Sequence, residues 1–350
     1  MAGDTWFANE KLTFCGVALL IAALAVPLPA CAQAPAVKIT LDWIVQGTHA
    51  PFFIARDKGY FKSEGVTVEA IDPGRGATNV AIAVAGGAYH LGWVDLPTMV
   101  RFNAQNPTTP LLAVYVSFEE TPLAFITRKA AGIRTPADLD GKKIAGGPGI
   151  AVHDTSAIFF KAAKAEHVKV DWISVQPQLY GPMLRRGEVD GTGGFTNSNI
   201  PAALEIGFKM DELSVLKYSD FGVDIYGVAL VGTKKFIDEN PAAVRGVVAG
   251  LNKGTKDAIS SPSQALALMQ TIDPMMKLEI EKVRLDIALG LTNTAAAQKN
   301  GLGGVTAEKL QRTIDATAEG YGLAVKPEPG SVFTDKFLPP VADRMPPKAG

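Results

Sequence analysis

Short apolar runs alternate with longer amphipathic stretches from Val37 onward, a pattern that predicts strands alternating with helices. Strands are predicted at 37–42, 66–71, 90–94, 111–118, 141–147, 170–175 and 227–232. Helices are predicted at 50–58, 74–87, 96–105, 152–165, 178–187, 241–259, 262–270, 276–289 and 306–319. Alternation of this kind favours right-handed crossovers and mainly parallel sheets.

Two α/β units are predicted, with the second inserted into the first. The expected fold class is α/β: a two-lobed molecule with two mainly parallel sheets and a ligand cleft between the lobes. Lobe 1 is expected at 35–128 and 226–340, lobe 2 at 129–225 and a tail at 341–350. The Pro-rich segment after Leu323 is expected on the surface. Ligands in such sheets lie beyond the carboxyl ends of the strands, and here two such edges would face each other.

The N-terminus predicts export. The apolar run FCGVALLIAALAVPL (14–28) is shorter than the roughly 20 residues of a membrane span. Small residues at Ala30 and Ala32 fit a signal-peptidase site, so a signal peptide is expected at 1–32 and the mature protein in the periplasm. In a second interpretation, Leu28-Pro29-Ala30-Cys31 is a lipobox and Cys31 carries a lipid anchor.

Composition excludes several classes of function. The 34 basic and 35 acidic residues leave no basic field, so nucleic acid is not an expected partner. Both cysteines, Cys15 and Cys31, lie in the leader. The mature chain would therefore lack disulfides, thiolate catalysis and cysteine-ligated metals.

Two glycine-containing turns are candidate ligand loops. GGPGIAVHD (146–154) follows a predicted strand and opens a helix, so backbone N–H groups near Gly149 can approach a polar ligand. It is neither a Rossmann fingerprint, because Val152 occupies the third glycine position, nor a P-loop, because Gly-Lys-Ser/Thr is missing. GRGAT (74–78) offers Thr78 as a hydroxyl donor. An ordinary strand–helix turn remains the alternative for both.

Polar and aromatic residues also follow the predicted strands. Asp42 and Asp95 each end a strand and can accept hydrogen bonds from a ligand, cap the next helix or form an ion pair between lobes. Trp43 and Tyr180 can stack on a flat ligand, although a place in the core is the more common fate of tryptophan.

The histidines do not indicate a metal or a catalytic site. His49 and His153 lie in the expected ligand loops, whereas His90 is expected to be structural and His167 solvated. No pair has metal-ligand spacing, and there is no Gly-x-Ser-x-Gly nucleophile motif. The sequence therefore predicts no catalytic residues, no metal and no cofactor.

Several segments together resemble the periplasmic solute-binding proteins of ABC importers. They are LDW…APFFIARDKGYFKSEGVTVEAI, AVAGGAYHLGWVD, PADLDGKKIAGGPG, RRGEVDG and FLPP, and the resemblance covers about residues 37–340. More narrowly, they resemble the group that binds thiamine-pyrimidine precursors, riboflavin, sulfonates, taurine or nitrate. SDFGVDIYGVALVGTKKFIDENP (219–241) is similar to the pyrimidine-precursor branch. The first loop departs from that branch, since IVQGTHAPF keeps only Thr48-His49 where an Asn-rich stretch is usual.

The resemblance implies a monomeric binding protein that is not an enzyme and passes a small planar or anionic molecule to an ABC permease and ATPase. A pyrimidine precursor is favoured as ligand; sulfonates, taurine, nitrate and aromatic carboxylates remain open. Capture would occur by hinge closure near 125–129 and 224–228. The residues expected to bind ligand are Asp42, Trp43, Thr48, His49, Thr78, Asp95, Gly149, His153, Tyr180 and Asn197.

Three other functions are alternatives to transport. An enzyme could use the cleft with His49 and Asp42 as a base pair. The related pyrimidine synthases need a cysteine-rich metal motif, which this chain lacks outside the leader. A sensor would need a membrane helix or an output domain, and neither is evident.

Overall fold

Two five-stranded sheets form the framework of residues 36–347, the part of the chain that this computed structural model describes. In spatial order the first sheet contains β2 (Val68–Asp72), β1 (Val37–Thr40), β3 (Leu91–Asp95), β10 (Val228–Thr233) and β4 (Leu111–Val116). The second contains β7 (Asp171–Ile173), β6 (Lys143–Ala145), β8 (Gly191–Phe195), β5 (Leu123–Arg128) and β9 (Leu213–Lys217). The predicted signal peptide, its cleavage site and lipid attachment at Cys31 lie outside the described residues.

Each sheet is mainly parallel, with one strand reversed, which confirms the predicted α/β class. The reversed strands are β10 in the first sheet and β5 in the second, and each is antiparallel to both of its neighbours. These are the strands that enter each sheet from the other one. Because the chain arrives at the edge where the parallel strands end, the entering strand must run in the opposite direction.

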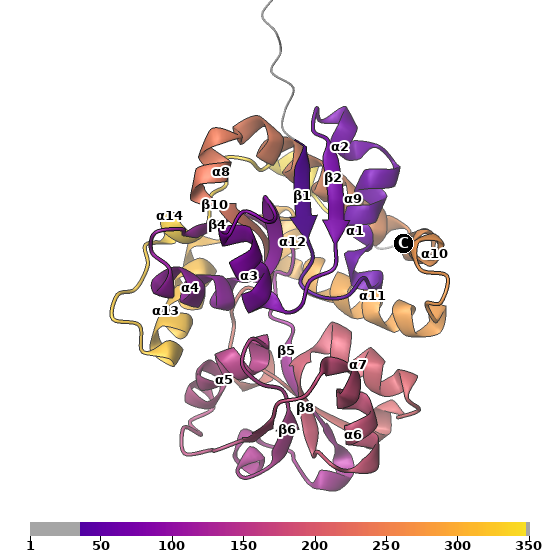
Figure 1. Cartoon of the computed structure of the whole chain (residues 1–350), viewed down its shortest axis with the longest axis vertical. Coiled ribbons are helices and arrows are strands. Elements are labelled where there is room, and N and C mark those ends of the chain that lie inside the picture. The colour runs from indigo at the N-terminus through magenta and orange to yellow at the C-terminus, as the bar shows by residue number, and fades with distance from the viewer. Residues whose placement is uncertain (1–35, 348–350) are drawn as a thin grey trace, which may run out of the picture. The chain divides into compact units, whose positions relative to one another are not determined.

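Helices cover both faces of each sheet (Figure 1). One face of the first sheet packs on α1 (Ala50–Asp57), α2 (Tyr60–Ser63), α8 (Lys234–Glu239), α9 (Pro241–Ser260), α10 (Pro262–Ile272), α11 (Leu278–Thr292) and α12 (Ala295–Asn300). The other packs on α3 (Ala77–Ala85), α4 (Leu96–Gln105), α13 (Ala307–Tyr321) and α14 (Pro329–Val332). The second sheet lies between α5 (Ala151–Ala162) on one face and α6 (Tyr180–Arg186) and α7 (Thr196–Glu205) on the other. We call the first sheet with its helices lobe 1 and the second lobe 2.

Local sequence signals explain several helix ends. α9 begins with Pro241 at its first position, where a missing N–H breaks no helical hydrogen bond. α6 ends at Gly187, which has φ 75°, a left-handed conformation that glycine adopts without a Cβ clash. Both ends are as the sequence predicts.

The segments 117–122 and 218–227 connect the lobes and contact each other. The N–H groups of Ser117 and Phe118 donate to the carbonyl of Val228 at 2.8 and 3.0 Å, and Gly227 N–H donates to Phe118 O at 3.0 Å. The first connection lies upstream of the expected boundary at 128/129, because β5 hydrogen-bonds only to strands of the second sheet. The predicted hinge near 125–129 is wrong for the same reason, because residues 125–128 belong to β5 of the second sheet.

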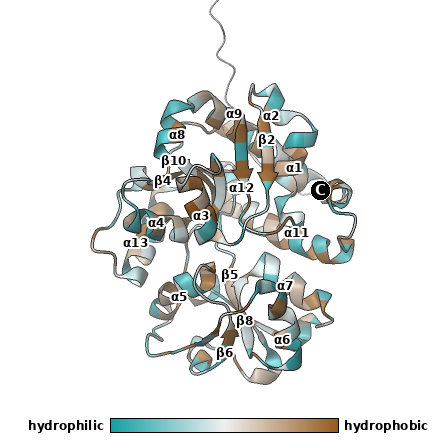
Figure 2. Cartoon of the chain, viewed as in Figure 1, coloured by the Kyte–Doolittle hydropathy of each residue, from teal (hydrophilic) through white to brown (hydrophobic). Residues whose placement is uncertain are grey.

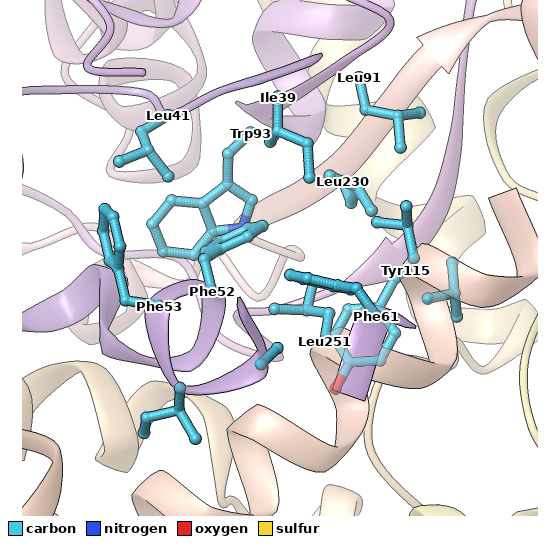
Figure 3. Packing of buried hydrophobic residues seen from close by; sticks show 14 of the residues in the cluster. Ile39, Leu41, Phe52, Phe53, Phe61, Leu91, Trp93, Tyr115, Leu230 and Leu251 are labelled. Atoms are coloured by element: carbon cyan, nitrogen blue, oxygen red, sulfur yellow. The ribbon is translucent and has the colours of Figure 1, made fainter. Parts of the chain in front are cut away.

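The core of lobe 1 is centred on Trp93 of β3 (Figure 3). Its ring meets Phe52 edge-on at a centroid distance of 5.6 Å and Phe118 at 5.2 Å. Aromatic pairs in this geometry add about 0.5–1.5 kcal/mol to the effect of burial alone. The hydropathy of the elements follows their position, as the hydrophobic β6 and the hydrophilic surface helix α8 show (Figure 2).

The Pro-rich segment after Leu323 lies mostly on the surface, as predicted, but a few of its residues are buried against lobe 1. Val332 and Phe333 are buried against lobe 1, and Phe333 forms a bridge with Ala113 of β4. α15 (Val341–Arg344) ends in a buried arginine whose Nε donates to the carbonyl of Pro339 at 2.9 Å. These buried residues attach the segment to lobe 1.

Candidate functional site

A cavity lies between the carboxyl edges of the two sheets, where the sequence predicts the ligand. Lobe 1 contributes residues that follow β1 and open α3. Lobe 2 contributes residues around the starts of α5 and α6, the end of β8 and the first turn of α7. The lining residues are Asp42, Trp43, Gly76, Ala77, Ile150, Ala151, Tyr180, Gly193, Gly194, Phe195, Ser198 and Asn199.

Asp42 is held in place by His49. The N–H of Gln46 donates to Nδ1 of His49 at 3.1 Å, so the ring hydrogen is on Nε2. Nε2 donates to Asp42 Oδ1 at 2.8 Å. Within the described residues, Oδ2 of Asp42 has no hydrogen-bond donor. The carboxylate therefore offers the cavity an oriented acceptor.

His49 itself does not line the cavity. Its side chain is fully buried, both ring nitrogens have partners, and the ring packs edge-on against Trp93 at 5.2 Å. This arrangement makes His49 a support for Asp42 and leaves it no nitrogen for a ligand.

Three aromatic residues line the cavity. Trp43, Tyr180 and Phe195 line it, and the first two also line an adjoining groove. Burial raises the pKa of the Tyr180 hydroxyl to about 12, so it stays protonated at neutral pH. Rings placed in this way suit a planar ligand.

Glycines allow the two lobes to approach each other beside the cavity. Gly76 has φ 98° and ψ 150°, a conformation almost restricted to glycine. A Cβ at this position would lie 3.0 Å from the carbonyl oxygen of Gly149 in lobe 2. Gly149 also has a positive φ, of 90°.

Asp154 on α5 joins the lobes on one side of the cavity. It accepts hydrogen bonds from Thr78 Oγ1 of lobe 1 at 3.1 Å and from Gly149 N–H at 3.1 Å. His153 Nδ1 lies 2.8 Å from its Oδ1, and Arg101 Nη1 of lobe 1 lies 3.3 Å from its Oδ2. The expected site residues Thr78, Gly149 and His153 thus meet, but at Asp154 and outside the cavity lining.

Thr48 and Asn197 join the lobes on the other side. Asn197 Nδ2 donates to Thr48 Oγ1 at 3.3 Å, and Ser198 Oγ donates to Gln46 Oε1 at 3.2 Å. Thr48 and Asn197 are buried and do not line the cavity.

Asp95 caps α4, one of the alternatives that the sequence leaves open. Its Oδ2 accepts the N–H of Thr98 at 3.0 Å, and the residue is buried away from the cavity. Burial raises the pKa of Asp95 to about 6, against an ordinary value of 3.8, and the N–H of Thr98 opposes this increase only in part.

The structure therefore brings Asp42, Trp43 and Tyr180 to the cavity from the predicted set. Sequence reasoning missed the lobe 2 wall formed by Phe195, Ser198 and Asn199. The signal for them was Thr-Asn-Ser-Asn (196–199) directly after a strand end, the same logic that selected Asp42. The expected set takes only Asn197 from this stretch, because GTGGF (191–195) has no apolar run that predicts a strand before it.

A family model described as NMT1/THI5 like matches residues 46–265. The chain belongs to the NMT1/THI5-like family. A formylaminopyrimidine-binding protein of Halalkalibacterium halodurans is 26% identical over 288 residues, which are 79% of this chain and 83% of that protein. The riboflavin-binding protein RibY of Chloroflexus aurantiacus is 24% identical, covering 92% of this chain and 95% of that protein. The periplasmic aliphatic sulphonate binding protein SsuA of Escherichia coli shares the fold, with a TM-score of 0.65 and 18% sequence identity. The superposition covers 89% of this chain and 91% of that chain.

This NMT1/THI5-like chain is thus a solute-binding protein of the kind that serves ABC importers, as its resemblance implies. Among residues 36–347, no group of three or more His, Cys, Asp or Glu side chains is placed to hold a metal ion. Within the same residues, no helix combines the length and the apolar character that crossing a membrane requires.

The buried Asp95 predicts a pH effect on stability. Between about pH 4 and pH 6 the folded protein keeps a proton on Asp95 that the unfolded chain releases, so this group lowers the free energy of unfolding as pH rises. Asp95→Asn keeps an acceptor for the cap and removes the titration. Above pH 6 we expect the free energy of unfolding of the variant to exceed that of the unmodified protein by on the order of 2 kcal/mol. Urea unfolding at pH 4 to 8 measures this; a difference independent of pH would contradict it.

Proposed function

We propose that the cleft binds a neutral, planar, amino-substituted heterocycle, with an aminopyrimidine favoured. The protein releases this ligand unchanged to an ABC permease and ATPase. The observation that carries the proposal is the oriented carboxylate of Asp42 in an otherwise uncharged, aromatic cavity. The free Oδ2 of Asp42 can accept a hydrogen bond from an exocyclic amine of such a ligand.

Charge argues against an anionic ligand. Among the described residues that line the cavity, Asp42 is the only charged one, and no lysine, arginine or histidine accompanies it. A sulfonate or nitrate would lie near this carboxylate without a cationic partner, and a low-dielectric site strengthens the repulsion. A neutral ring with an amino group meets no such penalty.

The remaining walls suit the acceptor atoms and the faces of a ring. The first residues of α3 and α5, Ala77 and Ala151, line the cavity, so unpaired N–H groups of both first turns are close to it. These groups can donate to ring nitrogens or to a carbonyl oxygen of the ligand. Trp43 and Phe195, which also line the cavity, can contact the faces of a flat molecule.

Two relatives support this ligand class. Both are binding proteins named for planar nitrogen heterocycles, a formylaminopyrimidine and riboflavin. An anionic sulfonate is the second candidate, because helix N-termini also favour negative charge. We place it second because of Asp42.

An enzymatic role for His49 and Asp42 has little support from the geometry. A general base must reach the ligand, whereas His49 is fully buried and both of its ring nitrogens are in use. We therefore assign the protein a binding role and no catalytic turnover. In this proposal it acts as a monomer in the periplasm.

Capture is proposed to occur by rotation of the lobes about the paired connections 117–122 and 218–227. A ligand that contacts both lobes binds the closed form more tightly than the open form, and so shifts the population toward it. The connection 218–227 overlaps the predicted hinge at 224–228.

A thermal-shift screen of the protein from Gln33 onward tests the ligand class. The panel contains aminopyrimidines, riboflavin, taurine, other sulfonates, nitrate and aromatic carboxylates. A compound at roughly 100 times its dissociation constant stabilises by about 2.7 kcal/mol, which raises the midpoint by a few degrees. We expect the shift with aminopyrimidines; a shift with sulfonates alone would support the second candidate and overturn the first.

A further inference from the structure

A buried ion pair lies beside the cavity on α11. Nε of Arg284 is 3.1 Å from Oε1 and 3.2 Å from Oε2 of Glu281. The two residues are only 4% and 7% exposed. A buried pair is costly unless its remaining donors and acceptors are also satisfied, and here the partners come from the loops around the cavity.

Arg284 reaches across to lobe 2. Its Nη1 donates to the carbonyl oxygens of Asn197 and Ser198 at 3.0 and 3.1 Å, in the first turn of α7. The carbonyl of Asn197 is available because the residue four positions later is Pro201, which has no N–H to complete the helical hydrogen bond. The proline in α7 thus creates an acceptor for an arginine of the other lobe.

Glu281 holds the part of the cavity wall that lobe 1 contributes. Its Oε2 accepts the N–H of Gly47 at 2.6 Å. Gly47 opens the 3-10 turn Gly47–His49, and His49 in turn orients Asp42. A Cβ on Gly47 would lie 3.0 Å from the carbonyl oxygen of Glu281, so glycine permits this approach. One ion pair therefore contacts both sides of the cavity.

We propose that Arg284, held by Glu281, is a positioning residue that latches the closed lobes around the ligand. Opening the lobes separates Arg284 from the two carbonyls of α7, while closure removes the ion pair from water with its hydrogen bonds complete. The latch thus favours the closed form even before a ligand is bound. The effect of the latch on ligand retention rests on the proposed function. Its effect on the balance between open and closed lobes does not.

Distances between spin labels in the two lobes test the latch without any ligand. The chain from Gln33 onward has no cysteine, so Lys62→Cys in lobe 1 and Glu166→Cys in lobe 2 give one exposed label on each. We expect Arg284→Met to move the distance distribution away from the closed separation. Arg284→Lys keeps the charge but lacks the planar fork, and should fold normally and shift in the same direction. Arg245→Met, which removes an exposed arginine of α9, should leave the distribution unchanged. Superposable distributions for the unmodified protein and both Arg284 variants would overturn the latch.

Ligand release provides the second readout. With formylaminopyrimidine as the probe, Arg284→Met should dissociate about tenfold faster or more, since a hydrogen bond to a charged group is worth a factor of that size. Pro201→Ala restores the N–H that competes for the Asn197 carbonyl, so the effect of Arg284→Met should be smaller in that background. Equal effects in both backgrounds would overturn the role of the proline. Failure of formylaminopyrimidine to bind would count against the proposed function, while the label distances would still decide the latch.

Discussion

Replacement of Asp42 by asparagine is expected to weaken aminopyrimidine binding by between about tenfold and hundredfold. The amide is nearly the same size as the carboxylate but has no charge, and it offers the ligand amine a weaker acceptor. A hydrogen bond to a charged group is worth about 1.5–3 kcal/mol, which sets the range. The loss should be larger for aminopyrimidines than for any compound without an amino group.

Isothermal titration calorimetry measures the change, with Asp72→Asn as the control. Asp72 also ends a strand of the first sheet, but it accepts from Tyr89 at 3.0 Å and does not line the cavity. The control should bind like the unmodified protein. Equal affinity of Asp42→Asn and the unmodified protein would show that the carboxylate does not contact the ligand.

The substitution Gly76→Ala is expected to reduce affinity by between about tenfold and hundredfold because it obstructs the closed form. The new Cβ would lie 3.0 Å from the Gly149 carbonyl oxygen of the other lobe. Overpacking at a rigid contact costs about 1–3 kcal/mol, and here the cost falls on the closed form alone. The positive φ of Gly76 adds a strain that is present in both forms.

Gly87→Ala separates these two effects. Gly87 follows the other end of α3 and also has a positive φ, of 77°, but a Cβ there would have no neighbour within 4 Å. Both variants should lose stability, measured by urea unfolding, but only Gly76→Ala should lose ligand affinity by calorimetry. Equal affinities of the two variants would mean that the lobes do not close at this contact.

Apolar patterning predicted most of the elements because their core faces are continuous. The predicted strands do not include β5, β8 or β9. At β8 patterning failed because Gly191, Gly193 and Gly194 replace the apolar residues of a buried strand. These glycines are needed because Ile144, Val152 and Asn199 occupy the space that side chains would fill. Patterning also cannot reveal strand direction, and so did not show that β5 and β10 are reversed.

The position of a strand end predicted part of the site, while side-chain direction could not be predicted. Asp42 and Trp43 follow β1 and reach the cavity as expected. His49, in the same loop, points into the core because the 3-10 turn at Gly47–His49 rotates it toward Gln46 and Trp93. The roles of Asp154 and Arg284 depend on hydrogen bonds between the lobes, and the partners in these bonds are far apart in the sequence.

A calorimetric titration with two matched compounds tests the central claim most directly. One is formylaminopyrimidine, and the other is the same ring without the amino group. The ligand is recovered afterwards and its mass is determined. We predict that one molecule of the amino compound binds per chain and is recovered unchanged, while the compound without the amine binds at least tenfold more weakly. Equal binding of the two compounds, or recovery of an altered molecule, would contradict the account.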